Sequence, residues 1–223
     1  MPYEFSTVRY KEVVNFINAL QKDISILDVG CGTGNVLEFI IRETGVKNVC
    51  GVDIDEEALC AARARGLRVF NLSILDDICG TLNEKFDVVI LGAVLHHLVG
   101  RTRNESLQLS HKALLNATKL LKNGGYLIIV EPTFKPFWLL GAVFYVKRFF
   151  SLFTHSRVAV LNYWNNLGPP VVSYLTTQKL LQIAGEFKEL SIVKKLQESN
   201  EVTFLMNLFF LKKYQVLLIY QKR

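Results

Sequence analysis

Residues 27–34 read Leu-Asp-Val-Gly-Cys-Gly-Thr-Gly, an apolar run that ends in three glycines at alternate positions. Glycine lets a chain turn sharply and lets the backbone approach a ligand closely, because it has no side chain. A second signal, Gly-Val-Asp-Ile-Asp, begins at residue 51. Together the two stretches predict a glycine loop and an acidic side chain at the carboxyl edge of a parallel sheet.

The acidic residue and the loop indicate the kind of ligand. Asp53 ends the apolar run 48–53, where its carboxylate can accept hydrogen bonds from the two hydroxyl groups of a ribose. The loop lacks the GxGxxG spacing of dinucleotide-binding proteins. The carboxylate of Asp28 would repel a pyrophosphate but attract a ligand that carries an ammonium and a sulfonium group. We therefore predict a crevice that binds a nucleoside with a cationic tail.

At these residues the chain resembles the class I S-adenosylmethionine-dependent methyltransferases. The resemblance continues through FDVVILGAVLHHL at 86–98 and LLKNGGYLIIVEP at 120–132, so it covers roughly residues 7–132 in order and spacing. It implies an α/β fold with a doubly wound, mostly parallel seven-stranded sheet, helices on both faces and a helical insertion after the fifth strand. It also implies methyl transfer, with S-adenosyl-L-methionine as the cofactor.

The resemblance assigns cofactor-binding roles along the glycine loop. Asp28 would reach the ammonium group of the cofactor directly or through water. The methionine part would lie along the loop, which the resemblance places at Gly30, Cys31, Gly32 and Gly34.

The nucleoside part would lie against the ends of the next strands. The resemblance assigns the ribose to Asp53 and the adenine face to Ile54, whereas Asp55 would cap a helix. Many relatives have an aspartate near the adenine amino group. Here the alternatives at that place are Ser73, with backbone groups of Ser73 and Ile74, or Asp76, and Gly92 would complete the cofactor site.

Three titratable residues are candidates for catalysis. His96 and His97 follow the fourth apolar strand, and Glu131 ends the fifth. A base at this edge could take a proton from a hydroxyl or amine acceptor. The alternative for the histidine pair is a structural hydrogen bond. No metal is implied, because no His/Asp/Glu cluster has the spacing of metal ligands.

Strands and helices alternate along the chain, as a parallel sheet buried on both faces requires. We expect Asn123-Gly-Gly to end a helix at 104–122 as a glycine cap, and Thr176 or Thr177 to begin a helix that ends at Ala184. The remaining helices are expected at 7–22, 34–44 and 55–65. The strands are expected at 25–30, 48–53, 67–72, 86–91, 126–130, 189–196, 202–208 and 214–220.

Length and composition bound the rest. With 223 residues, half of them apolar and 21% charged, the chain fits a single methyltransferase domain over 1–223. Its four cysteines form no CxxC pair, which suits reduced thiols in the cytoplasm. The first residues, Met1-Pro-Tyr-Glu-Phe, lack the features of a signal peptide. We therefore expect a cytoplasmic enzyme.

The insertion at 133–172 breaks the alternation. No Asp or Glu occurs between Pro132 and Gly185, whereas that span carries five Lys or Arg residues, both tryptophans and 11 of the 25 aromatic residues. Two interpretations stay open: a pair of helices that cover the core, or a mobile lid over the acceptor pocket. In the second interpretation, the residues that bind the acceptor include Trp138, Tyr145 and Trp164.

The apolar insertion favours a small or lipid-like, apolar or amphiphilic acceptor. Lys147 and Arg148 suit an anionic head group or contact with an anionic membrane surface. Nucleic acid is the weaker alternative: RYKEVVNFI and HHLVGRTR are similar to tRNA wobble-base methyltransferases, but the basic residues form no phosphate track. A catalytically silent protein of the same fold is the third alternative, and no obligate protein partner is evident.

Overall fold

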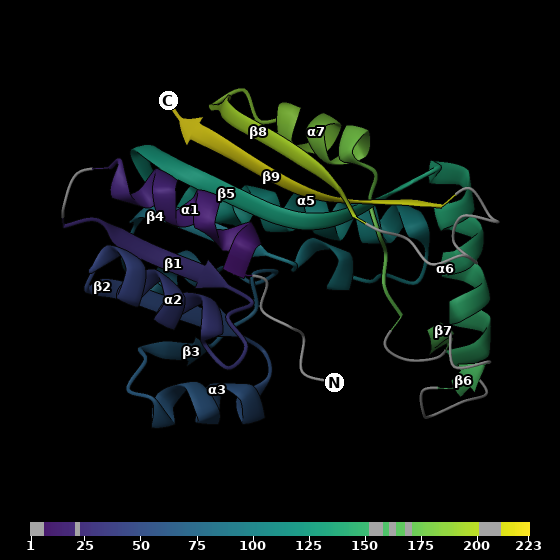
Figure 1. Ribbon diagram of the computed structural model, residues 1–223, viewed down its shortest axis with the longest axis horizontal. Helices are drawn as coiled ribbons and strands as arrows, with labels where there is room; N and C mark the ends of the chain where they lie inside the picture. The colour runs from purple at the N-terminus through teal and green to yellow at the C-terminus, as the bar shows by residue number, and fades with distance from the viewer. Residues whose placement is uncertain (1–6, 21–22, 152–157, 161–163, 168–170, 201–210) are drawn as a thin grey trace.

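The computed structural model describes residues 7–20, 23–151, 158–160, 164–167, 171–200 and 211–223. Within these ranges the chain forms one seven-stranded sheet and a separate two-stranded sheet (Figure 1). The strands of the larger sheet are β1 (Ser25–Val29), β2 (Asn48–Asp53), β3 (Val69–Asn71), β4 (Phe86–Gly92), β5 (Leu121–Lys135), β8 (Leu190–Asn200) and β9 (Lys212–Lys222).

The order of the strands is β3-β2-β1-β4-β5-β9-β8. Strands β1 to β5 are parallel to one another, and β9 lies antiparallel between β5 and β8. The sheet is therefore mostly parallel, and the predicted doubly wound α/β fold is confirmed. All five residues of β1 are buried, as expected for a central strand that is covered on both faces.

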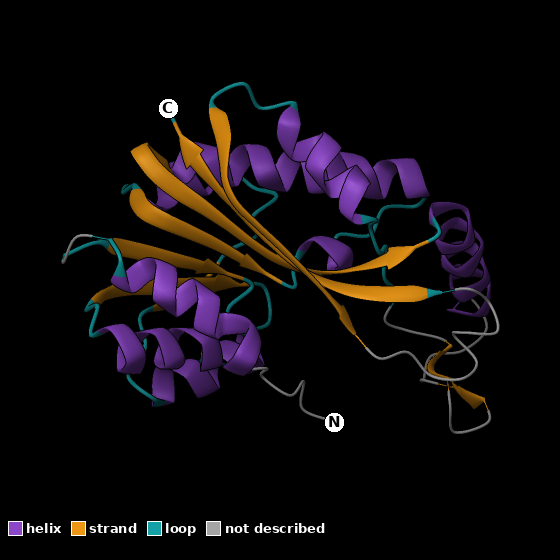
Figure 2. Cartoon of the chain, turned by 45° about the horizontal axis from the view of Figure 1, so that its top comes forward, coloured by secondary structure: helices purple, strands orange, loops and turns teal. Residues whose placement is uncertain are grey.

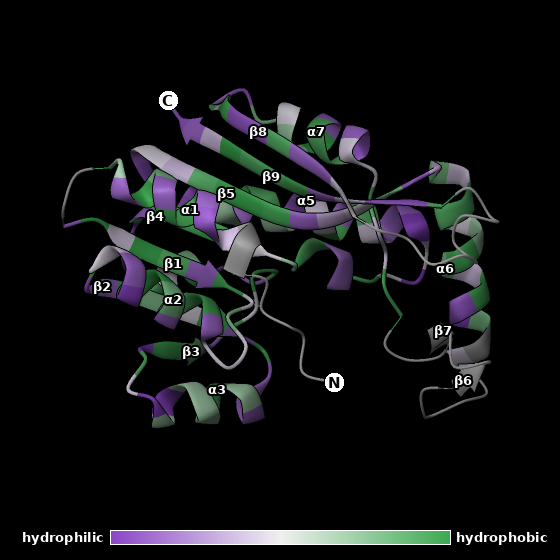
Figure 3. Ribbon diagram, in the orientation of Figure 1, coloured by the Kyte–Doolittle hydropathy of each residue, from purple (hydrophilic) through white to green (hydrophobic). Residues whose placement is uncertain are grey.

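Helices cover both faces of the sheet (Figure 2). They are α1 (Thr7–Asn18), α2 (Asn35–Thr44), α3 (Glu56–Ala64), α4 (Ile78–Leu82), α5 (Arg103–Leu120), α6 (Phe137–Ser151) and α7 (Thr177–Gly185). One apolar cluster joins α1, α2 and α3 to the sheet, and another joins α4, α5 and α7 to it. Between them the central strands are mainly hydrophobic, as Figure 3 shows. The parallel strands thus end together at one edge, where the glycine loop lies.

The predicted glycine cap at Asn123-Gly-Gly is wrong. Helix α5 ends at Leu120, because Leu121 takes extended angles (φ −77°, ψ 141°) and pairs with Phe86 of β4. Residues 123–125 therefore belong to β5. Gly125 is required by close packing, since a Cβ there would lie 3.0–3.1 Å from three backbone carbonyl oxygens. The predicted cap of α7 is confirmed: the Thr176 hydroxyl accepts a hydrogen bond from the Lys179 amide.

The insertion contains one helix and one β-hairpin within its described residues. After β5 comes α6, and then β6 (Val158–Val160) pairs antiparallel with β7 (Trp164–Leu167). The interpretation as a pair of helices is therefore wrong. The strand expected at 202–208 lies outside the described residues. None of the described helices is both long and apolar enough to cross a membrane.

Candidate functional site

The glycine loop is built from left-handed backbone angles. After β1, the φ angles of Gly30, Gly32 and Gly34 are 71°, 51° and 83°, values that disfavour residues with a Cβ. The amides of Gly30 and Cys31 both donate to the carbonyl oxygen of Val52, at 2.7 and 3.1 Å. The loop is thereby fixed to the end of β2, the strand that leads into Asp53.

The three glycines have different surroundings. A Cβ at Gly30 would lie 2.5 Å from Val94, and one at Gly34 would lie 2.2 Å from Leu67, so both positions are close-packed against protein. At Gly32 no heavy atom lies within 4 Å of the Cβ position. Gly32 is therefore the place where the loop leaves open space above its backbone.

Asp53 ties the loop to the end of β2. Its Oδ2 accepts from the Gly32 amide at 2.7 Å, and its Oδ1 accepts from the Asp55 amide at 3.0 Å. A carboxylate oxygen has two lone-pair sites, so each oxygen can still accept from a ligand hydroxyl. The expectation that Asp55 caps a helix is confirmed, because its side chain accepts from the Glu57 and Ala58 amides at the start of α3.

A cavity of about 780 Å³ lies over the glycine loop, within the range typical of small-molecule sites. We call it the loop cavity. Of the predicted cofactor residues, eight line it: Gly30, Cys31, Gly32, Asp53, Ile54, Ser73, Ile74 and Gly92. Its full lining consists of residues 10, 29–33, 35–36, 52–55, 72–75, 92–94, 97–99 and 109. The sheet edge thus brings most of the predicted cofactor residues together.

The formally charged side chains among the described residues that line the loop cavity are all acidic. Among its described lining residues, Asp53 and Asp55 carry carboxylates, and none is a Lys or Arg. A ligand rich in phosphate would meet no basic side chain there, whereas a cationic ligand would meet two acids. The lining therefore favours a cationic ligand.

Asp28 lies behind the loop and does not line the cavity. Its side chain is 1% exposed, and its Oδ2 has no hydrogen-bond partner among the described residues. Burial, together with the nearby Asp53 carboxylate, raises the pKa of Asp28 to about 8. Asp28 is therefore a buried acid with an unsatisfied oxygen. A hydrogen-bond donor of the ligand that reaches it through the loop would satisfy this oxygen.

On the adenine side, the structure separates the two alternatives by position. Ser73 and Ile74 line the loop cavity, whereas Asp76 is exposed outside it. The Ser73 hydroxyl accepts from the Leu75 amide at 3.1 Å, which holds the turn after β3. Ile54 is 72% exposed at the cavity, an unusual position for an isoleucine. These placements leave an apolar surface suited to a planar ring.

His96 and Glu131 form a buried pair away from the cavity. His96 Nδ1 lies 2.8 Å from Glu131 Oε2, and both side chains are 3% exposed. Glu131 Oε1 accepts from the Leu95 amide at 2.6 Å. Neither residue lines the loop cavity. The structure places Glu131 away from the loop cavity, with both of its oxygens bonded within the protein at the turn after β4, so its catalytic role stays a prediction.

His97 is the candidate base that the structure places at the cavity. Desolvation by its surroundings, together with the neighbouring His96 ring, lowers the pKa of His97 to about 4. The ring is therefore neutral at pH 7, and its side chain is exposed to solvent. A neutral imidazole can accept a proton or a hydrogen bond.

The aromatic residues expected to bind the acceptor are not brought to the cavity. Trp138 and Tyr145 are 72% and 51% exposed on α6, and neither lines the loop cavity. They lie on the outer side of the helix, because Leu140 and Phe144 occupy its buried side. Trp164 is placed only as a member of β7; its side chain lies outside the described residues.

Some lining residues were missed in the sequence. Tyr10 of α1 lies over the sheet edge, and a Cβ at Gly92 would lie 2.3 Å from its hydroxyl oxygen. Its position three residues before Val13 was the available signal, since both face the sheet. Leu98, Val99 and Leu109 add an apolar wall that no motif marked. Within the described residues, no group of three or more His, Cys, Asp or Glu could hold a metal ion.

Known proteins match about half of this chain by sequence. A methyltransferase domain family matches residues 27–127. The chain is 29% identical over 134 residues to the mitochondrial ubiquinone biosynthesis O-methyltransferase of Candida albicans, covering 56% of this chain and 36% of that protein. It is 29% identical over 131 residues to the ribosomal protein L11 methyltransferase of Dictyoglomus turgidum, covering 56% and 40%. The chain thus spans less than half the length of these curated relatives.

The fold matches solved structures over nearly the whole chain. An S-adenosylmethionine-dependent methyltransferase from Methanosarcina mazei superposes with a TM-score of 0.64 at 20% identity, covering 93% of this chain and 96% of that one. At this identity the likeness concerns the fold alone, and it agrees with the sheet order and the glycine loop described above. The chain thus matches a methyltransferase domain family over residues 27–127, and its fold is that of an S-adenosylmethionine-dependent methyltransferase.

Proposed function

We propose that this chain binds S-adenosyl-L-methionine in the loop cavity and transfers its methyl group to a small or lipid-like, apolar or amphiphilic acceptor. The observation that carries the proposal is the loop cavity itself. It joins an open glycine backbone at Gly32 to the Asp53 carboxylate, and its described lining has acids but no Lys or Arg. A nucleoside with a cationic tail fits that combination.

The residues fit the parts of the cofactor. Asp53 would accept from the ribose hydroxyls, and Ile54, Ser73 and Ile74 would surround the adenine. The methionine part would lie over the open face of Gly32, with the orphaned Asp28 carboxyl behind the loop. Cys31 contributes packing only, since burial raises the pKa of its thiol far above the ordinary value.

When bound, S-adenosylmethionine supplies a methyl group attached to a sulfonium, whose sulfur becomes a neutral thioether once the methyl group has been transferred. The protein's part is to hold an acceptor in line with that methyl group and to exclude water. Val94, Leu98 and Val99 offer apolar surface for this purpose. His97 can accept a hydrogen bond from a hydroxyl or amine acceptor and orient it, although its lowered pKa makes it a weak base at pH 7.

The acceptor class rests on the apolar wall of the cavity, which includes Leu72, Leu98 and Leu109. One of the two curated relatives is named for ubiquinone biosynthesis, and the other is named for ribosomal protein L11. The apolar wall favours the first kind. We propose a reducing compartment such as the cytoplasm, since the four cysteines form no disulfide within the described structure.

Calorimetry tests the cofactor, and a transfer assay tests the activity. We expect S-adenosylmethionine and its demethylated product to bind with micromolar affinity, about −8 kcal/mol. Incubation with methyl-labelled cofactor should then label an apolar phenol or amine from a panel of small acceptors, but not bulk tRNA. Binding without transfer to any acceptor would identify a silent protein of this fold, and labelled tRNA would favour the nucleic-acid alternative.

A further inference from the structure

One helix carries most of the exposed apolar side chains of the described protein. Among the eight large apolar residues that are exposed, five belong to α6. Trp138, Tyr145, Val146 and Phe149 are 72%, 51%, 46% and 58% exposed, and their spacing places them on one side of the helix. We call these four residues the outer face of α6. Leu140, Phe144 and Lys147 are buried on the opposite side.

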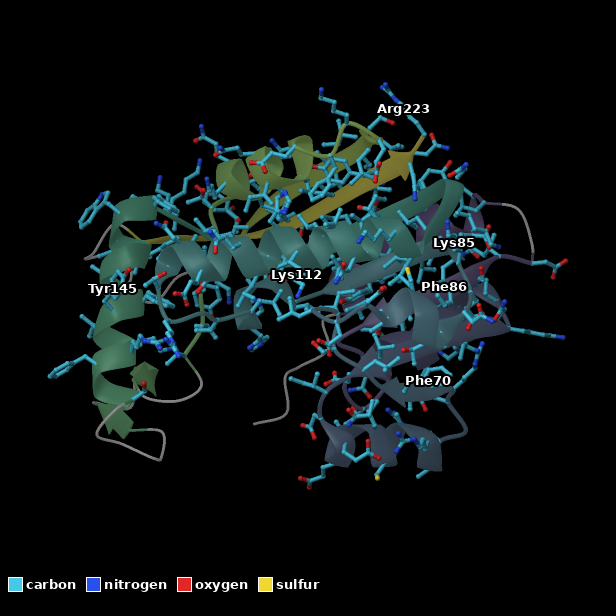
Figure 4. The ribbon with its side chains drawn as sticks, turned by 180° about the vertical axis from the view of Figure 1, so that it is seen from behind. Phe70, Lys85, Phe86, Lys112, Tyr145 and Arg223 are labelled. Atoms are coloured by element: carbon cyan, nitrogen blue, oxygen red, sulfur yellow. The ribbon has the colours of Figure 1, made fainter. Side chains whose placement is uncertain are left out.

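The outer face stands at one end of the molecule. In Figure 4, Tyr145 of α6 and Phe70 of the edge strand β3 lie at opposite ends. Monomeric proteins seldom expose a group of large aromatic side chains together unless the group meets a partner. The inner side of α6 packs on the protein, whereas the four side chains of the outer face stay 46–72% exposed.

The segment that carries the outer face is basic, and the acid at the loop that Tyr145 and Arg148 contact, Glu105, accepts from the Arg101 amide. No Asp or Glu occurs from residue 133 to residue 184, a span that includes all of α6. At the end of the β5–β9 ribbon, Lys135 pairs in register with Lys212, and both residues are exposed. Helix α6 begins two residues after Lys135. The outer face is therefore bordered by lysines at its amino-terminal end.

These features favour one kind of partner. Two copies of this chain facing each other would bring the same basic residues together, which repels. Trp and Tyr beside Lys are typical of proteins that lie at a membrane surface, where aromatic rings enter the headgroup layer and lysines attract anionic lipids. Contact with an anionic membrane explains why the span has no acids, because carboxylates would be repelled by the anionic lipids. We propose that the outer face of α6 docks this protein on an anionic membrane surface.

The docking face is connected to the loop cavity. Arg148 Nη1 donates to the Gly100 carbonyl oxygen at 2.7 Å, and the Arg103 amide donates to the Tyr145 hydroxyl at 3.4 Å. Gly100 follows Val99, which lines the cavity. If the cavity takes a lipid-like acceptor, docking brings it to the layer that holds such molecules. This consequence rests on the proposed function, whereas the docking itself does not.

Vesicle binding tests the proposal without a methyl donor. The protein is mixed with vesicles of phosphatidylcholine and phosphatidylglycerol, or of phosphatidylcholine alone, and bound protein is measured by sedimentation. We expect binding to the anionic vesicles that weakens with salt. In a Trp164→Phe background, which leaves Trp138 as the single tryptophan, the fluorescence should shift to the blue on binding. Failure of the folded protein to bind anionic vesicles overturns the proposal.

Matched variants locate the surface. Trp138→Ala with Phe149→Ala should weaken vesicle binding about tenfold or more, while Ile192→Ala with Val193→Ala, which removes two 50% exposed residues of β8, should not. Lys135→Gln with Lys212→Gln should also weaken binding roughly tenfold or more, unlike Lys47→Gln with Lys188→Gln at other exposed sites. Equal effects of test and control variants overturn the assignment. So does a dimer that forms without lipid and that the α6 variants abolish.

Discussion

The glycine-loop edge and the α6 end of this molecule differ in how tightly their residues are constrained. At the loop, left-handed φ angles demand glycine, and the Asp53 carboxylate holds the Gly32 amide. On the outer face of α6, side chains such as Trp138 are largely exposed, and composition alone marks the segment. Backbone geometry therefore determines which residue each position of the loop can have. On the outer face of α6 no single position is constrained in this way, and only the shared character of the exposed side chains is informative.

The largest expected effect tests the loop. Gly32→Val should reduce cofactor affinity more than about 100-fold. The valine side chain would fill the open space over the loop, where the protein backbone must approach the cofactor. The left-handed backbone strains this variant, but the fold should survive because no heavy atom other than those of its chain neighbours lies within 4 Å of the new Cβ. Calorimetry measures the affinity, and thermal unfolding measures the fold.

Gly66→Val is the matched control for that variant. Gly66 also has a positive φ (77°) and an open Cβ position, but it follows α3 and does not line the loop cavity. The strain of the left-handed backbone, roughly 1–2 kcal/mol, is then common to both variants. Equal cofactor affinity in the two variants would show that the loop is misplaced.

The second prediction uses the buried acid behind the loop. The pKa of Asp28 is raised from 3.8 to about 8 in the folded protein, so the native state keeps a proton that the unfolded chain releases above about pH 4. Stability from this group is therefore lost as the pH rises from about 4 to 8. Asp28→Asn should be more stable than the wild type by a few kcal/mol at pH 9, and equally stable near pH 4.

Urea unfolding at several pH values measures this difference in the absence of cofactor. Asp77→Asn, at an exposed aspartate outside the cavity, is the control and should show no such trend. A difference between Asp28→Asn and wild type that does not change with pH would contradict the raised pKa.

Asp53→Ala tests the ribose assignment. Loss of a charge-assisted hydrogen bond should weaken cofactor binding by roughly 1.5–3 kcal/mol. Because Asp53 also accepts from the Gly32 and Asp55 amides, the free energy of unfolding must be measured in parallel. Asp77→Ala removes the same charge elsewhere and should bind cofactor as the wild type does. Unchanged affinity of Asp53→Ala would refute the assignment.

The sequence predicts most where a local rule leaves few choices. The alternating glycines and the acid at residue 53 follow from close approach and from hydrogen bonding, and both lie at the cavity. The end of α5 was missed because Gly124, with φ 78°, looks like a helix cap, although it bends a strand instead. Local sequence does not reveal that Leu121 pairs with Phe86 across the sheet.

The roles of the polar residues after β4 depend on long-range contacts. His96 and Glu131 are far apart in the sequence, and their pairing places both inside the protein. Only the fold decides that His97, and not His96, reaches the cavity. In the same way, the aromatic content of α6 was visible in the sequence, but the side of the helix that carries Trp138 and Tyr145 depended on which side packs.

The fourth prediction separates structure from catalysis at this pair. Glu131→Gln keeps an oxygen for the Leu95 amide but replaces the buried carboxylate beside His96 with a neutral amide, so the charge-assisted hydrogen bonds of this group are lost. The free energy of unfolding should fall by about 1–2 kcal/mol, while cofactor affinity stays unchanged. A variant of wild-type stability that had lost methyl transfer would instead give Glu131 a catalytic role.

The smallest expected effect concerns Trp138. Because its side chain is 72% exposed on α6 and lies outside the loop cavity, Trp138→Ala should change neither the cofactor affinity nor the free energy of unfolding by more than about 0.5 kcal/mol. Its effect should appear only when anionic vesicles are present. Phe144→Ala, at a 1% exposed residue on the inner side of α6, is the contrast and should lower stability by roughly 3 kcal/mol or more. A contradicting result would be a sharp fall in the turnover of a water-soluble acceptor by Trp138→Ala in the absence of lipid. Trp138 would then contact the acceptor, and α6 would belong to the active site as the glycine loop does.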